Sequence, residues 1–399
     1  MNQLELIINN SNLPETENMA GQENQARTGA RVEGPYINSS FSKLLPTLQL
    51  AWDSTSLGEF KGCQRRYKYT IIDGWVPREQ SVHLRFGLEY HSALELYQHR
   101  LAAGDDHESA LIESVKHALI STWDDKLNRP WISDNPNKNR ITLIRSIIDY
   151  LDNFKNDSFK TYILANGKAA VELSFRLELD KKTTITQVEC PICFGDGQIL
   201  REPLNLNLPD HIDDGLEECR NCNGTGTVGE TYILCGHFDR IAEFQEALWI
   251  PDAKTTKFTL NSAYFAKYSP DNQVSFYSYA GKLVFSEEIK GVIIDASQIK
   301  VESTEFERRE IARSESYLAE WITDTEYYIS LAEVAAERNH WPMNEKMCGQ
   351  VYEDPQTGEL SYQCPFRKVC AEAPEIRETL LKANYDKRVW DPLKSREKP

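Results

Sequence analysis

The spacing of apolar positions changes along the chain, and it predicts helices first and strands afterwards. Up to residue 157 the apolar side chains recur with the helical period, which is typical of helices that bury one face. Ser54 or Thr55 is a suitable cap for the first helix. Residues 169–179 and 183–189 alternate between apolar and polar, as strands do. The predicted helices cover about 54–69, 82–102, 107–127 and 138–157.

Further strands are predicted in the second half of the chain. The segment ETYILCGHFDRIAEFQEALWIPDAKTT (230–256) is typical of two strands, a short turn and a third strand. Residues 291–301 (GVIIDASQIKV) predict another strand, with helices expected at about 269–285 and 304–337. Residues 1–40 are rich in Asn, Gln, Glu, Ser and Gly without a periodic pattern, so we expect them to be disordered.

Composition and charge narrow the class of protein. A chain of 399 residues, 40% of them hydrophobic, has ample material for one large domain with insertions or for two domains. No apolar run approaches the roughly 18 residues of a membrane span, and the N-terminus lacks the layout of a secretory signal. We therefore expect a soluble cytoplasmic protein. The net charge of −16 argues against indiscriminate coating of nucleic acid.

The grouping of the nine cysteines indicates metal sites, because disulfides are rare in intracellular proteins. CPICFGDG and CRNCNGTG both have the form CxxCxGxG, and together they supply four thiolates for one tetrahedral zinc ion. The glycines let the backbone approach the sulfurs. These units resemble the zinc-binding repeats of DnaJ-type co-chaperones, although only two repeats and no His-Pro-Asp sequence are present. The predicted zinc ligands of this insertion (190–228) are Cys190, Cys193, Cys219 and Cys222.

A carboxylate and a lysine stand two residues apart in LWIPDAKTTK (248–257), so Asp252 and Lys254 point to the same face of a strand. An internal ion pair or a turn is the simple interpretation, since burying either charge alone is costly. Asp239 on the preceding strand and His91 on an apolar helix offer further ligands. Two carboxylates suit Mg²⁺ or Mn²⁺, and the imidazole favours Mn²⁺. Such an ion activates water and offsets phosphate charge, and a lysine can orient or deprotonate that water.

Four motifs occur in order along the chain. A helical His follows a Gly (Gly87, His91), an Asp stands in a GxxD strand (Asp239), a DxK strand follows, and Gln273 and Tyr277 lie at i and i+4 on one helix face. This arrangement strongly resembles the RecB-like exonuclease branch of the PD-(D/E)xK nuclease superfamily, over about residues 50–372. Taken singly, the histidine is more often a core residue, Asp239 can pair with Arg240, and Gln273 and Tyr277 can simply pack.

The resemblance implies a restriction-endonuclease-like α/β core, with a central mixed sheet flanked by helices, that hydrolyses DNA phosphodiesters. An exonuclease acting on single-stranded ends is the form that this branch favours. By the same resemblance Lys254 is the catalytic lysine, and Gln273 and Tyr277 position the DNA strand. The metal ligands that it implies are His91, Asp239 and Asp252.

A second cysteine set is split between the two ends of the domain. It resembles the iron–sulfur staple of some RecB-like nucleases, including AddB subunits and the exonuclease of CRISPR adaptation systems. A 4Fe–4S cluster takes four thiolates, but the first two C-terminal cysteines are spaced more widely here than in those relatives, so zinc remains the alternative ion. Residues 352–362 (YEDPQTGELSY) predict a hairpin between them. The set consists of Cys63, Cys348, Cys364 and Cys370; Cys235 is interpreted as a buried core thiol.

The basic stretch KGCQRRYKY (61–69) has two interpretations. It is an ordinary solvated helix face, or a DNA contact in which its cations meet phosphates and its Tyr67 and Tyr69 stack on unpaired bases. The cations in question are Arg65, Arg66 and Lys68.

The whole chain is then expected to be a stand-alone nuclease of a prokaryotic or phage-infected cell, since it has no P-loop for a helicase motor. Its expected partners are DNA and proteins of recombination, phage or CRISPR-type systems; homo-oligomerisation is left open. The rival hypotheses are a catalytically silent DNA-binding protein and a partner-recruiting module built on the knuckles. The expected parts are 1–40, a helical part 41–189, the insertion 190–228, the catalytic sheet 229–303, the C-terminal helix and cluster tail 304–375 and a charged tail 376–399.

Overall fold

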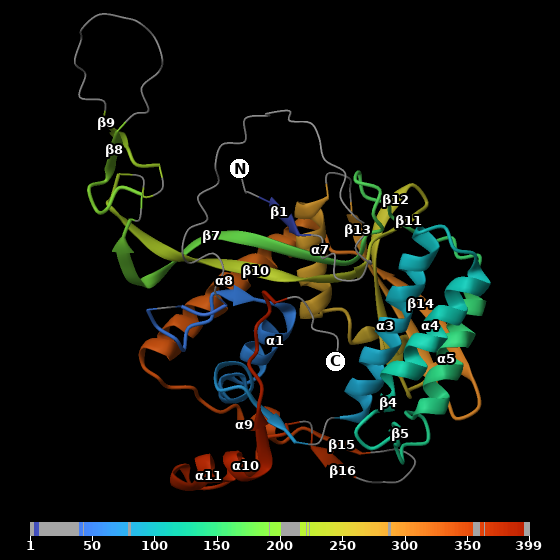
Figure 1. Cartoon of the computed structure of the whole chain (residues 1–399). Helices are drawn as coiled ribbons and strands as arrows, with labels where there is room; N and C mark the ends of the chain where they lie inside the picture. The colour runs from blue at the N-terminus through green and yellow to red at the C-terminus, as the bar shows by residue number, and fades with distance from the viewer. Residues whose placement is uncertain are drawn as a thin grey trace, which may run out of the picture.

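The structure is a computed structural model of the chain (Figure 1). The expectation that residues 1–40 are disordered falls almost entirely outside the described residues. Among those residues no helix is both long and apolar enough to pass through a membrane. The described residues are 4–7, 40–42, 44–78, 81–190, 192–200, 216–220, 222, 224–285, 289–353, 360–362 and 364–394.

Two sheets form the centre of the molecule. The first has the order β1–β7–β10–β2, in which β10 is antiparallel to β7 and parallel to β2. The second has the order β14–β13–β12–β11–β6, in which β12 and β13 are parallel and the other neighbours antiparallel. The strands are β1 (Leu4–Ile7), β2 (Ala51–Trp52), β6 (Lys160–Thr161), β7 (Val171–Glu189), β10 (Thr227–Arg240), β11 (Ala242–Phe244), β12 (Ala247–Thr256), β13 (Ile289–Ile299) and β14 (Thr304–Ile311).

The predicted run of three strands over 230–256 is confirmed as β10, β11 and β12. β10 leads almost directly into β11, so this segment joins the two sheets. The turn between β11 and β12 places Gln245 and Glu246 at positive φ, which matches the twist of a tight hairpin. The last residues of β10 and the middle of β12 are thereby brought into adjacent positions.

Helices cover the sheets on both sides (Figure 1). One layer packs against β12, β13 and β14, and the other, with α1, α7 and α8, packs against β7, β12 and β13. The mixed α/β architecture with a helix-flanked sheet is as predicted. The first layer contains α3 (Val82–Ala102), α4 (His107–Ser121) and α5 (Arg140–Asn153); the second contains α1 (Ser54–Gly62), α7 (Asn272–Val284) and α8 (Glu315–Glu337).

Three helix predictions need correction. The expected helix over 54–69 is broken at Cys63, whose extended backbone (φ −159°, ψ 112°) separates α1 from α2 (Gln64–Tyr67) and the following π-turn. Its cap is Asp53, because this carboxylate accepts the N–H of Ser56. The helix expected from residue 304 begins only after Ser314, because Thr304–Ile311 alternates and pairs with β13.

A helix expected to continue to residue 127 also ends early. α4 stops at Ser121, and a small hairpin of β4 (Trp123–Asp124) and β5 (Arg129–Pro130) follows.

The long strands β7 and β10 extend beyond the body of the molecule as a two-stranded arm (Figure 1). The far end of the arm carries β8 (Gln198–Leu200) and β9 (Leu216–Glu218), which pair with each other. The cysteine insertion therefore sits at the tip of a hairpin and leaves the pairing of the core strands intact.

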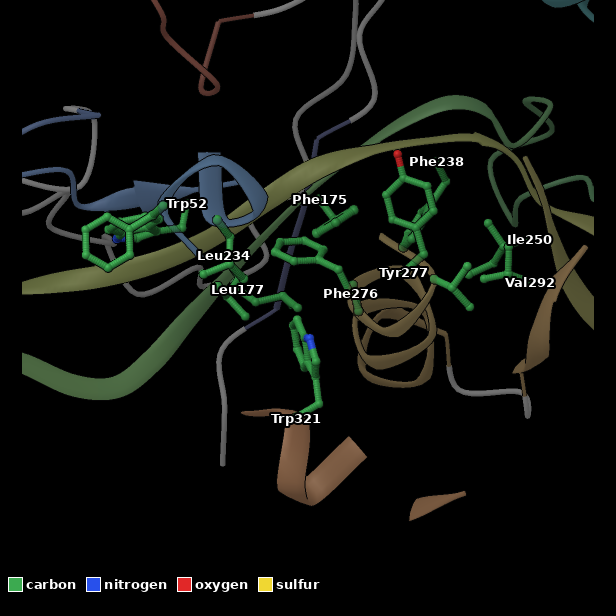
Figure 2. Packing of buried hydrophobic residues seen from close by; sticks show 14 of the residues in the cluster. Trp52, Phe175, Leu177, Leu234, Phe238, Ile250, Phe276, Tyr277, Val292 and Trp321 are labelled. Carbon is green, nitrogen blue, oxygen red and sulfur yellow. The ribbon is translucent and has the colours of Figure 1, made fainter. Parts of the chain in front are cut away.

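The main hydrophobic core lies where α7 and α8 meet the two sheets (Figure 2). Phe175 and Phe238 stack at 4.5 Å between ring centroids, and Phe276 meets Trp321 of α8 edge-on at 5.6 Å. A Cβ on Gly236 would lie 2.9 Å from the Phe175 ring, so the glycine of the GxxD sequence is needed for this packing.

The C-terminal segment returns to the first helices. After α9 (Glu345–Cys348), the predicted hairpin is confirmed as β15 (Val351–Glu353) and β16 (Leu360–Tyr362). α10 (Arg367–Cys370) and α11 (Pro374–Asn384) follow, and β17 (Tyr385–Lys387) pairs with β3 (Trp75–Pro77). The two ends of the domain are thus joined by backbone pairing as well as by side chains.

Candidate active site

The DxK strand is the centre of the site. β12 is paired on both sides, and Asp252 on it is only 2% exposed. As predicted, Lys254 shares its face: Lys254 Nζ lies 2.8 Å from Asp252 Oδ2. The internal ion pair that the sequence offered as the simple interpretation is therefore present, and it lies next to the other predicted residues.

His91 and Asp239 form a second pair beside the first. His91 Nδ1 of α3 lies 3.1 Å from Asp239 Oδ2 at the end of β10. Arg240, the alternative partner for Asp239 in the sequence, reaches Asp157 at 3.9 Å. The helix and two strands that carry the first three motifs therefore bring their functional side chains together.

The fourth motif holds the lysine. Lys254 donates a hydrogen bond of 2.9 Å to Gln273 Oε1, and the Gln273 amide donates to the hydroxyl of Tyr277 at 3.2 Å. Asp271 caps α7 by accepting the N–H of Val274, which fixes the helix end that carries Gln273. The Tyr277 ring is buried against Phe238 (Figure 2). Both predicted DNA-positioning residues thus position Lys254, and their contact with DNA stays a prediction.

The charges of the two pairs influence one another. Burial raises the pKa of Asp252 and the charge of Asp239 raises it further, while Lys254 and His91 oppose the shift. Burial alone would lower the pKa of Lys254, but Asp252 and Asp239 outweigh it and raise the pKa. Asp239 likewise overcomes burial and raises the pKa of His91. Asp252 therefore has the Lys254 ammonium beside it, and Asp239 has the His91 imidazole, whose protonated form it favours.

The donor set fits a divalent cation, since two carboxylates and an imidazole are ligands of Mg²⁺ and Mn²⁺. In the described part of the chain, however, the ligand atoms of His91, Asp239 and Asp252 do not all lie within 4.8 Å of one another. Because His91 Nδ1 and Asp239 Oδ2 are only 3.1 Å apart, binding one ion through all three would require Asp252 and this pair to move closer together. The geometry is that of a site closed by its own ion pairs.

A small cavity of about 40 Å³ lies against this site. Besides His91 and Asp239, acidic side chains line it that were not singled out in the sequence. Glu95 lies one turn after His91 on α3, so helical spacing would have found it. Asp295 interrupts the apolar run of β13 in the same way as Asp252 interrupts β12, which was the available signal.

Asp295 belongs to a buried network that anchors α5 to the sheet. Tyr150 of α5 donates a hydrogen bond to Asp295 Oδ2, and Arg308 Nη2 of β14 lies 2.9 Å from the same oxygen. Arg308 also binds Asp157 through Nη1 at 2.8 Å. This network stabilises the wall of the cavity behind the catalytic strand.

The four cysteines of the insertion converge as predicted. Cys190 Sγ and Cys219 Sγ lie 3.7 Å apart, and Cys193 Sγ and Cys222 Sγ 3.6 Å apart. Bonds of about 2.3 Å in a tetrahedral zinc site place sulfurs about 3.8 Å apart, so the spacing fits one ion. It is also the one group of three or more His, Cys, Asp or Glu among the described residues whose ligand atoms lie this close together.

The glycines of the two repeats allow the backbone to pack closely around the sulfurs. The N–H of Gly197 lies 3.2 Å from Cys193 Sγ, and that of Gly226 lies 3.3 Å from Cys222 Sγ. Both glycines have positive φ, and a Cβ on either would lie within 2.3 Å of a backbone oxygen of the other repeat. Only glycine permits this approach.

The second cysteine set is brought together from both ends of the domain. Cys63 lies at the break between α1 and α2, and Cys348 ends α9. Cys364 precedes α10, and Cys370 ends it. Burial raises the pKa of Cys364, and the nearby Cys348 and Cys63 raise it further. No three of these four sulfurs lie within 4.8 Å of one another, so the set is wider than one tetrahedral zinc site.

The structure contradicts part of the DNA-binding interpretation of the basic stretch 61–69. Tyr67 is fully buried and stacks on Trp52, and Tyr69 is buried against Phe366. The prediction that these two tyrosines stack on bases is therefore wrong, because both rings belong to the core. Cys235 is a buried thiol as expected.

The cations of the same stretch have partners within the protein. Arg65 Nε donates to the carbonyl of Trp341, Arg66 pairs with Glu59, and Lys68 pairs with Asp73. Their contact with phosphates stays a prediction.

Comparison with known proteins agrees with this geometry. A family model of the PD-(D/E)XK nuclease superfamily matches residues 52–371, which span the four motifs and the second cysteine set. No curated protein matches the chain. Because the family model covers most of the sequence and the DxK strand is in place, the chain belongs to the PD-(D/E)XK nuclease superfamily.

Proposed function

We propose that the protein is a metal-dependent DNA exonuclease of the RecB-like branch that acts on single-stranded ends. The observation that carries the proposal is the Asp252–Lys254 pair, which Gln273 holds and which the His91–Asp239 pair faces. Superfamily membership implies metal-dependent nuclease activity. The order of the motifs supports the branch.

His91, Asp239 and Asp252 would hold Mg²⁺ or Mn²⁺. The charge of Asp239 raises the pKa of the buried Asp252, because the two carboxylates repel each other. A cation bound between them would offset this repulsion. When bound, the ion supplies an activated water and charge for the phosphate. His91 would give up the Nδ1 contact with Asp239 to expose that carboxylate.

Lys254 is proposed as the catalytic lysine. An ammonium has three N–H donors, of which one is directed to Asp252 and one to Gln273. The third remains to contact the attacking water or a phosphate oxygen. Gln273 and Tyr277 limit the rotation of this side chain, which is the kind of support that precise catalytic geometry requires.

The cysteine sets are proposed as structural cofactor sites. Cys190, Cys193, Cys219 and Cys222 would hold zinc at the tip of the arm, in a closed site without catalytic chemistry. The wider set of Cys63, Cys348, Cys364 and Cys370 suits a 4Fe–4S cluster better than zinc. The charges of Arg65 and Arg377, which lower the pKa of Cys370 against the effect of burial, would help to hold its anionic ligands.

DNA is the proposed substrate, and proteins of recombination, phage or CRISPR-type systems are the proposed partners. A cytoplasmic location in a prokaryotic or phage-infected cell is part of the same proposal. The N-terminal segment 1–40 and the charged tail 376–399 are candidate sites for such proteins.

The test is degradation of end-labelled single-stranded DNA with Mn²⁺ or Mg²⁺, using protein purified without oxygen. Wild type should cleave and Lys254→Ala should not, with cation binding retained. Lys155→Ala is the matched control, because Lys155 is an exposed lysine just beyond α5. The label pattern reports polarity. Equal cleavage by wild type and Lys254→Ala refutes the assignment of the lysine, and binding without cleavage by wild type indicates a silent DNA-binding protein.

A further inference from the structure

The N-terminal end of α3 has several basic side chains and, among the described residues, no acidic side chain in its first turn. Ser81 at the N-cap makes no side-chain capping bond. The first N–H groups of a helix are unpaired within the helix and carry the positive end of its dipole. An acidic side chain or a cap usually satisfies them. Neither is present among the described residues at this end.

A buried lysine lies beneath the same turn. Lys138, which immediately precedes the cap of α5, is 2% exposed, and its Nζ has no hydrogen-bond partner among the described residues. The ammonium lies 4.0 Å from the ring centroid of Phe86, in the second turn of α3. Burying an ammonium without a counter-ion is costly, so this placement needs a reason.

Two further basic side chains, His83 and Lys257, lie near this turn. His83 in the first turn of α3 is exposed, and the charges of Lys138 and Lys257 both reach it. Burial, followed by these two lysines, lowers the pKa of His83. Burial lowers the pKa of Lys138 to about 7, and no carboxylate of the described residues counteracts it. The group has the charge pattern of an anion site.

We infer that the N-terminal turn of α3, with His83, Lys138 and Lys257, binds a phosphate of the DNA strand a few nucleotides away from the one being cleaved. Backbone N–H groups of a helix end, together with basic side chains, are a recurrent phosphate site. The inference rests on the proposed nuclease function and adds a subsite to it. Lys138 reaches the anion by turning its side chain from Phe86 toward His83.

The position of the turn explains why the ligand is a DNA phosphate. His83 precedes His91 by two helical turns, about 12 Å along α3. Lys257 follows Lys254 by three residues, about 10 Å along an extended chain. For a single strand that keeps the stacked spacing of about 3.4 Å per nucleotide, the subsite lies about three to four nucleotides from the scissile phosphate. A strand that enters the site would thus be gripped at two points.

The test combines substitutions in the protein with single neutral phosphates in the DNA and compares the resulting binding affinities. Full-length protein in Ca²⁺ buffer, without Mg²⁺ or Mn²⁺, is titrated against fluorescent single-stranded 12-mers in which one phosphate at a time is a neutral methylphosphonate. Binding is followed by anisotropy. For wild type, one position about three to four nucleotides from the cleavage point should weaken binding about tenfold, as expected for one charge-assisted phosphate contact.

Lys138→Met should weaken binding of unmodified DNA about tenfold and make that position insensitive to the methylphosphonate. The slope of log affinity against log salt should fall by about 0.7, the value for one phosphate contact with a single strand. Lys155→Met, at the other end of α5, should change neither. His83→Gln, at an exposed position, is the second variant if Lys138→Met alters the thermal unfolding profile.

The inference is overturned if the methylphosphonate effects are the same in wild type and in both variants. If the effects are equal but wild type still cleaves DNA, the subsite is refuted and the proposed nuclease function stands. A wild type that neither binds nor cleaves DNA overturns the proposed function as well. If inorganic phosphate binds at this turn while the methylphosphonate effects are equal in wild type and variants, the turn binds free phosphate and the DNA subsite is refuted.

Discussion

Lys254→Met should destabilise the protein at neutral pH because it leaves Asp252 buried without its cation. Breaking a buried ion pair on one side costs about 3–5 kcal/mol. The Lys254 side chain is 25% exposed whereas that of Asp252 is 3% exposed, so water partly reaches the lysine but not the carboxylate. We therefore expect a loss of about 3 kcal/mol in the free energy of unfolding at pH 7.

The loss should depend on pH in a defined direction. Burial and Asp239 already raise the pKa of Asp252, and Lys254 is the largest influence against this shift. Its removal raises the pKa further, by about two units if the cost is about 3 kcal/mol. A raised carboxylate pKa penalises the folded state above that pKa and ceases to do so below it. The difference between wild type and Lys254→Met should therefore shrink as the pH is lowered from 7 to 5.

Urea unfolding followed by tryptophan fluorescence at both pH values measures this effect, with Lys155→Met as the control. The double variant Asp252→Asn/Lys254→Met should recover about 2 kcal/mol relative to Lys254→Met, because the carboxylate that lost its cation is replaced by a neutral amide. The reasoning fails if the double variant is no more stable than the single variant at pH 7, or if the cost of Lys254→Met is the same at both pH values.

Three further changes test other parts of the molecule. Gln273→Leu removes one of the groups that hold Lys254, so DNA cleavage should slow about tenfold while cation affinity, measured by calorimetry, stays unchanged; equal turnover would refute the positioning role. Gly236→Ala places a Cβ 2.9 Å from Phe175 and should cost about 1–3 kcal/mol in urea unfolding, whereas a neutral result would show that the ring can move. Cys193→Ser should reduce the bound zinc, measured by elemental analysis, without unfolding the core, since the insertion lies at the tip of the arm; loss of the core transition would contradict the independence of the arm.

The catalytic motif was predictable because each part depends on short-range spacing. The i, i+2 spacing of Asp252 and Lys254 in a strand and the i, i+4 spacing of Gln273 and Tyr277 in a helix determine which side chains share a face. The CxxCxGxG repeats likewise determine their own local turns. The sequence could not show that His91 bonds to Asp239, since that contact depends on how α3 packs against β10.

Wrong predictions arose where tertiary packing outweighed local pattern. Tyr67 and Tyr69 stand among basic residues and suggest a surface, but the return of the C-terminal segment buries Tyr69, and Trp52 covers Tyr67. Thr304–Ile311 was assigned to a helix because it precedes a long helical pattern, yet β13 has a free edge there that this segment fills.

The sequence by itself determined the long strands around the DxK motif, most helices, the four motifs and the two cysteine groupings, because these follow from residue types at local spacings. The tertiary structure alone decided which charges are paired and which are buried. Lys138 looks ordinary in the sequence, and Asp295 differs only by interrupting an apolar strand; tertiary packing buries Lys138 against Phe86 of α3 and Asp295 against Tyr150 of α5. Burial makes their charges matter, because a charge costs free energy only once its water has been removed.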